Sequence, residues 1–75
     1  MRFDYYLYFE REKVMNSENL KKILEEKKIT QAELAKNVGI TQAYASYLLN
    51  GFKQPSVELL KRIAVFLKVS LDELV

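Results

Sequence analysis

The 75-residue chain has room for one small domain. It contains neither cysteine nor histidine, which excludes disulfide bonds, thiolate metal sites and histidine-based general acid–base catalysis. Twelve basic and ten acidic residues leave a net charge of +2, too mild an excess to diagnose nucleic-acid binding by itself. The longest apolar run near the N-terminus, Tyr5 to Phe9, is too short for a membrane span or a signal peptide. We therefore expect a cytoplasmic protein that is not an enzyme, binds no cofactor and does not enter a membrane.

The first part of the chain, residues 1–16, differs from the rest in its pattern. Aromatic side chains, which favour β-structure, are concentrated between Phe3 and Phe9, and the apolar positions there recur with a period of two. This predicts a β-strand arm. A single strand leaves its backbone groups unpaired, and the rest of the chain offers no second strand. We therefore expect the arm to pair with its counterpart in a homodimer; the alternative is that it has no role.

The remainder of the chain, residues 17–75, has a helical period and predicts a compact all-α domain of five helices. The first helix is expected to begin with Ser17 as its N-cap. Its apolar residues Leu20, Ile23 and Leu24 recur at the spacing of one helix face.

The segment from Gln31 to Gly51 predicts two short helices joined by a tight turn. Thr30 and Glu33 have the spacing of a capping box, and Thr41 is placed to cap the second helix. Gly39, between the helices, can adopt the positive φ that ends the first one. The residues expected at the crossing of the two helices are apolar or small: Leu34, Ala35, Val38, Ile40, Ala45 and Leu48. This is the layout of a helix-turn-helix, whose second helix lies in the major groove of DNA.

Two more helices are expected after this motif. Ser56 is placed to cap the fourth helix, and Ser70 and Glu73 have capping-box spacing at the start of a short fifth helix that buries Leu71 and Leu74. The residues of the fourth helix expected to face inward are Val57, Leu60, Ile63, Ala64 and Leu67. The basic residues expected to lie on ordinary solvated surfaces are Lys21, Lys22, Lys61 and Arg62.

Two stretches, ITQAELAKNVGITQAYASYLLNG and QPSVELLKRIAVFLKVSLDEL, contain most of the distinctive residues of the chain. Their order closely resembles the phage repressor/Cro-type (XRE) helix-turn-helix family, over Leu20 to Leu74. The resemblance implies a sequence-specific DNA-binding domain that acts as a dimer on a two-fold operator. The expected function is transcriptional regulation by a repressor, with double-stranded DNA as partner.

The resemblance also implies which residues contact DNA. The positions that read bases in the family correspond to Gln42, Ala43 and Tyr47, with Thr41 and Tyr44 nearby. The positions that contact the DNA backbone correspond to Gln31, Asn50 and Lys53. The chemistry agrees, because a glutamine amide can pair with adenine, a small apolar side chain can lie against a thymine methyl group, and amide donors bind phosphate.

Three departures from the family pattern are visible. Relatives often have glycine at the positions of Lys28 and Lys68, and often have an internal Arg–Glu ion pair at the positions of Leu24 and Leu49. An apolar contact between the two leucines is expected here instead. Residues 41–50 carry no charged side chain, although relatives often have Arg or Lys there.

The neutral second helix and the aromatic arm leave two alternative functions open. The first is a protein-interaction module, such as an antitoxin that binds a toxin partner. The second is an oligomerisation module that has lost DNA binding.

Overall fold

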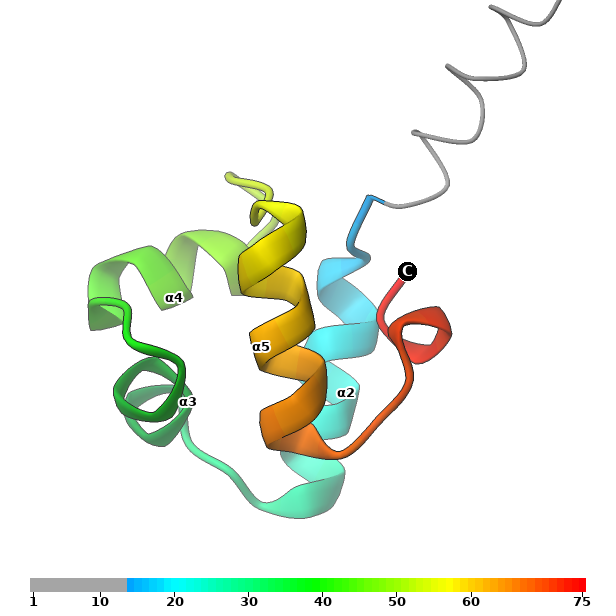
Figure 1. Ribbon diagram of the computed structural model, residues 1–75. Helices are drawn as coiled ribbons and strands as arrows, with labels where there is room; N and C mark the ends of the chain where they lie inside the picture. The colour runs from blue at the N-terminus through cyan, green and yellow to red at the C-terminus, as the bar shows by residue number, and fades with distance from the viewer. Residues whose placement is uncertain (1–13) are drawn as a thin grey trace, which may run out of the picture.

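The computed structural model describes residues 14–75, so the predicted strand between Phe3 and Phe9 lies outside the described residues. Within them the elements are α2 (Ser17–Lys27), α3 (Gln31–Val38), α4 (Gln42–Leu49), α5 (Val57–Leu67) and the 3-10 helix η1 (Leu71–Glu73) (Figure 1). The prediction of a compact all-α domain is confirmed for this part of the chain. The last of the five predicted helices is a single 3-10 turn and not an α-helix. No helix in residues 14–75 combines the length and the apolar character needed to cross a bilayer.

The helix-turn-helix is held by the caps expected from the sequence. Thr30 Oγ1 accepts a hydrogen bond from the Glu33 N–H at 3.1 Å, and Glu33 Oε1 accepts one from the Thr30 N–H at 2.9 Å. Thr41 Oγ1 accepts from the Tyr44 N–H at 3.1 Å. Gly39 has φ +80° and ends α3. These local bonds satisfy N–H groups that the first turn of a helix leaves free, so they fix where α3 and α4 begin.

The N-cap of α2 is Asn16, so the prediction of Ser17 was wrong by one position. Asn16 Oδ1 accepts hydrogen bonds from the N–H groups of Glu18 at 2.9 Å and Asn19 at 3.3 Å. Asparagine is as strong an N-cap as serine, and Ser17 is already the first helical residue.

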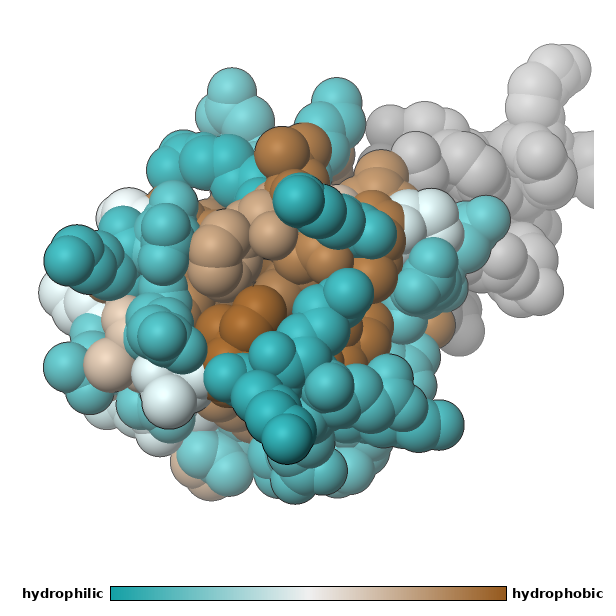
Figure 2. Space-filling view, turned by 90° about the horizontal axis from the view of Figure 1, so that it is seen from below, coloured by the Kyte–Doolittle hydropathy of each residue, from teal (hydrophilic) through white to brown (hydrophobic). Residues whose placement is uncertain are grey.

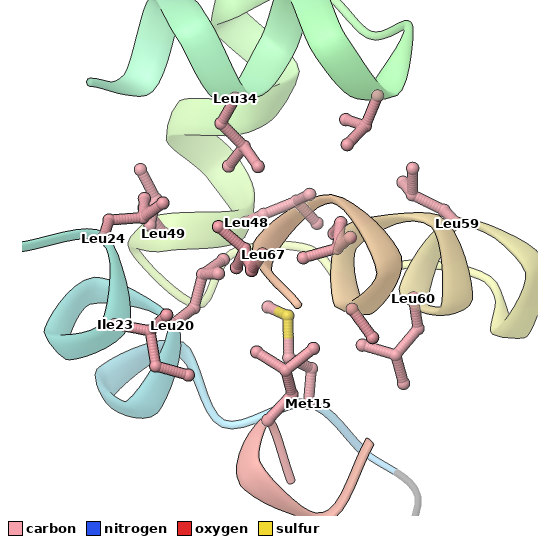
Figure 3. Close-up of a cluster of buried hydrophobic side chains, with 14 residues drawn as sticks. Met15, Leu20, Ile23, Leu24, Leu34, Leu48, Leu49, Leu59, Leu60 and Leu67 are labelled. Carbon is pink, nitrogen blue, oxygen red and sulfur yellow. The ribbon is translucent and has the colours of Figure 1, made fainter. Parts of the chain in front are cut away.

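The four α-helices contribute to one apolar core, together with Met15 before α2 and Leu74 after η1. α3 packs against α4 and α5, α2 packs against α4, and η1 packs against α5. Figure 3 shows buried side chains from several helices converging on this core. The largest fully buried side chains are Leu20, Leu34, Val38, Leu48, Ile63, Leu67 and Leu74. No polar side chain of residues 14–75 is buried, so the core that positions α3 and α4 is apolar throughout.

Two residues predicted to face inward are exposed. Val57 is 57% exposed and Leu71 is 38% exposed, whereas Leu74 is buried as expected. The buried stripe of α5 includes Leu59 as well as Leu60, and at 100° per residue Val57 lies about 90° from its centre. Leu71 opens a turn too short to have a full buried face.

Leu24 and Leu49 both lie in the core, 5% and 8% exposed. They project from α2 and α4, which pack together, and Figure 3 shows them next to each other. The expectation of an apolar contact in place of an ion pair agrees with this arrangement.

Lys28 and Lys68 end α2 and α5 in the left-handed conformation, with φ of 57° and 59°. Glycine adopts this conformation without a Cβ penalty, so each lysine costs on the order of 1 kcal/mol. The two helix ends nevertheless keep the backbone geometry that the family resemblance implied.

The residues just before α2 are hydrogen-bonded to the loop after α4 and to the C-terminal turn. Met15 is buried, and its N–H donates to Gln54 Oε1 at 3.0 Å while its carbonyl accepts from Gln54 Nε2 at 3.2 Å. The Asn16 N–H donates to the carbonyl of Leu74 at 2.7 Å. The Gln54 amide therefore ties the segment before α2 to the loop that follows α4.

Candidate nucleic-acid interface

The α3–α4 pair lies on one side of the molecule. Figure 1 shows η1 and the C-terminal residue on the opposite side, with α5 between them. The outer surface of the pair is therefore not covered by any other element of residues 14–75.

The predicted base-reading residues share one exposed face of α4. Gln42, Ala43 and Tyr47 are all exposed, and Tyr47 retains 46% of its accessible surface. At 100° per residue they span an arc of about 140°, so one surface can meet all three. Thr41, the exposed N-cap, comes directly before Gln42 in the chain. Four of the five residues predicted to lie at the bases or beside them are thus exposed at α4.

Tyr44 is placed differently from these four residues. It is half-buried and packs against the apolar core. Its ring therefore packs α4 against the core and does not lie on the face formed by Gln42, Ala43 and Tyr47.

Two of the residues predicted to contact phosphate form hydrogen bonds within the protein. Gln31 Nε2 donates to the carbonyl of Gln42 at 3.0 Å, which links the first residues of α3 and α4. Asn50 Nδ2 donates to the Ser46 carbonyl at 2.9 Å and to Ser46 Oγ at 3.3 Å. A carboxamide NH₂ carries two donor hydrogens, so Gln31 can hold α4 and still donate to a phosphate. Asn50 would have to give up its longer bond, to Ser46 Oγ, in order to do so.

Lys53 lies in the loop after α4 and is exposed. The N–H groups of Phe52 and Lys53 both donate to the Tyr47 carbonyl, at 2.9 and 3.3 Å, so this loop is anchored to the end of α4. Gly51, with φ +77°, makes the turn into it.

Phe52 is the residue at this surface that sequence reasoning missed. It is 77% exposed, and its ring centroid lies 6.5 Å from that of Tyr47. The available signal was a large aromatic residue placed between the Asn50–Gly51 turn and a candidate phosphate-binding lysine.

Arg62 is exposed, as expected, but its side chain also bonds within the protein. Its Nη1 donates to the Val38 carbonyl at 3.0 Å. A cation at the last carbonyls of a helix is favourable for both hydrogen bonding and the helix dipole. Arg62 thus ties α5 to the end of α3, beside the turn of the motif.

The surface has little charge of its own. Between residues 30 and 54 the charged side chains are Glu33, Lys36 and Lys53. Few cations are therefore placed here to contact phosphates, so the electrostatic contribution of this surface to any DNA affinity is small.

A family model described as "Helix-turn-helix" matches residues 20–74. This chain belongs to that helix-turn-helix family, which is of the phage repressor/Cro (XRE) type. The family resemblance seen in the sequence is confirmed by this match, and the family is a non-enzymatic one.

Among proteins of known sequence, the chain is 48% identical over 61 residues to the uncharacterized HTH-type transcriptional regulator YqaE of Bacillus subtilis, covering 80% of this chain and 52% of YqaE. Among solved structures it is similar to a transcriptional regulator from Listeria innocua, with a TM-score of 0.75, 27% identity and coverage of 83% of this chain and 58% of that one. It is also similar to SinR, the master regulator for biofilm formation, solved in complex with DNA. That match has a TM-score of 0.71, 25% identity and coverage of 77% of this chain and 97% of that one. The chain thus spans about half the length of the curated relative.

Proposed function

We propose that this chain is a sequence-specific DNA-binding transcriptional regulator, a dimeric repressor that reads the major groove with α4. The observation that carries the proposal is the exposed face of Gln42, Ala43 and Tyr47 on the second helix of a helix-turn-helix. SinR, a similar structure, was solved in complex with DNA, and YqaE is named as a transcriptional regulator. A cytoplasmic location is part of this proposal.

The proposed contacts divide into two kinds. Gln42 and Ala43, in the first turn of α4, read base edges, with Tyr47 one to two turns further along. Thr41 and Tyr44 lie beside them, the first as cap and the second as support. Gln31, Asn50 and Lys53 contact phosphates and set the position of α4 in the groove.

The test of base reading is selection of bound sites from random duplex DNA, using the full chain and the Gln42→Ala variant. A glutamine that reads one base pair should contribute about 1–3 kcal/mol of discrimination. We expect the full chain to select a two-fold consensus and the variant to lose preference at one base pair per half-site. An unchanged consensus would show that Gln42 does not read a base.

Lys53→Ala provides the complementary test, because a phosphate contact carries no sequence information. It should weaken all duplexes alike and reduce the slope of log K against log salt by about 1 per chain. Lys61→Ala is the matched control, since it removes the same charge from the exposed surface of α5. Equal effects of the two variants would mean that Lys53 acts only through net charge.

We propose that residues 2–10, within the N-terminal arm, pair as a β-strand with those of a second copy and so create the homodimer, as their sequence pattern suggests. Deletion of residues 1–13 should then convert the dimer to a monomer in sedimentation experiments. The deletion should retain Val14 and Met15, because Met15 is buried and its backbone bonds with Gln54. If the truncated chain dimerises with unchanged affinity, the dimer interface lies elsewhere, and the C-terminal turn is the next candidate.

A protein-interaction module, such as an antitoxin with a toxin partner, is the second candidate function. It is favoured by the absence of charge on α4 and by exposed apolar residues away from it, such as Val65, which is 76% exposed. Figure 2 shows a face of the molecule on which an apolar area is framed by hydrophilic side chains. Co-purification of a stoichiometric second protein, together with failure to select any DNA site, would favour this function.

A further inference from the structure

Phe52 has an unusual position for an aromatic residue. It is the most exposed large apolar side chain of residues 14–75, at 77%. Its neighbours in the loop and on α4 are Tyr47 and Lys53, both proposed above to contact DNA. The ring therefore adds an apolar area to a surface whose other members are polar or basic.

The position of Phe52 relative to α4 is fixed by its backbone. Its N–H donates to the Tyr47 carbonyl at 2.9 Å, and Gly51 with φ +77° supplies the turn that makes this bond possible. The two rings lie 6.5 Å apart between centroids at an interplanar angle of 60°, within the range of favourable tilted aromatic pairs. Tyr47 and Phe52 thus form one tilted aromatic pair at the end of α4.

We propose that the Tyr47–Phe52 pair receives the 5-methyl group of a thymine and so specifies a T·A pair in each half-site. The proposal rests on the function proposed above and names one base that the site recognises. Phenylalanine has no hydrogen-bonding group, and apolar contact with the thymine methyl is the means by which such a side chain reads the major groove. Lys53, adjacent in sequence, holds the phosphate backbone close to the ring, which favours DNA over an apolar protein partner.

The contact is tested on the duplex recovered by selection, with each thymine replaced in turn by deoxyuridine, which lacks only the methyl group. For the full chain, replacement of a single thymine at the contacted position of one half-site should weaken binding about four-fold, the effect expected for one buried methyl group. Phe52→Ala should bind the thymine duplex more weakly and should no longer distinguish thymine from uracil at that position. Val65→Ala is the matched control, since Val65 is equally exposed on α5, and it should behave as the full chain does.

Phe52→Leu is a second variant, which keeps an apolar side chain and should retain part of the thymine preference. The inference is overturned if Phe52→Ala distinguishes thymine from uracil as strongly as the full chain does. It is also overturned if the variant binds DNA normally but loses self-association, because the ring would then contact protein. Failure of the full chain to select any site is a different result, which would overturn the DNA-binding function itself.

Discussion

Leu49→Glu is expected to unfold the domain. Leu49 is 8% exposed and lies in the core with Leu24, so a carboxylate there would be buried without a partner. An unpaired buried charge costs about 3–5 kcal/mol, which equals the stability that a core of this size supplies. Circular dichroism at 25 °C should therefore show loss of most helical signal or a strongly lowered melting temperature. Ala43→Glu is the control, because it introduces the same charge at an exposed position of the same helix and should melt as the full chain does.

The double variant Leu24→Arg with Leu49→Glu should recover part of this loss. The two leucines occupy the positions at which relatives often have an Arg–Glu ion pair, and a buried charge is tolerated better when paired. Residues in contact show interaction energies, whereas distant residues have additive effects. If the losses of the two single variants simply add in the double variant, Leu24 and Leu49 are not coupled and the proposed replacement of the ion pair is wrong.

Ala43→Glu is expected to abolish specific DNA binding while leaving the fold intact. Ala43 is exposed in the first turn of α4, where a glutamate would point its charge at the bases and phosphates. Juxtaposed like charges cost several kcal/mol, so affinity for the selected duplex should fall by a factor of at least about 100. Binding is measured by fluorescence anisotropy of the labelled duplex at fixed salt.

Val65→Glu makes the same change in net charge on α5, at a residue that is 76% exposed. It should lower affinity only slightly, through the weaker overall attraction to DNA. Comparable losses in Ala43→Glu and Val65→Glu would mean that α4 has no special place at the interface.

The helix boundaries of the motif were predictable because their determinants are local. Thr30 with Glu33, and Thr41, cap the helices through bonds spanning three residues, and a glycine at Gly39 can take positive φ. The misplaced cap at Ser17 arose because two adjacent residues were both good caps, and only the backbone conformation decides between them.

The hydrogen bonds that the sequence did not reveal join residues that are far apart along the chain. Arg62 bonds the Val38 carbonyl across 24 positions, and Gln54 bonds Met15 across 39. Nothing in their local sequence distinguishes such side chains from solvated ones. Phe52 lies in the loop after α4, and its exposed position beside Tyr47 could not be read from its neighbours in the sequence.

The sequence predicted which residues lie at the candidate site, but it did not predict all of the hydrogen bonds that those residues make. The family motif placed Gln42, Ala43 and Tyr47 on the outer face of α4, where the structure also has them. The hydrogen bond from Gln31 to the Gln42 carbonyl depends on the packing of the two motif helices and could not be read from spacing. The bond from Asn50 to the Ser46 carbonyl spans only four residues at the end of α4.

The central claim, that α4 and the loop after it form the DNA-binding surface, is tested most directly by NMR. The full chain, labelled with ¹⁵N, is titrated with the selected duplex, and the amide shift changes are assigned to residues. We predict that the largest changes occur at the N-terminal turn of α3, along α4 and in the loop that contains Phe52 and Lys53. Changes concentrated on α5 and η1, with α4 unaffected, would contradict the account.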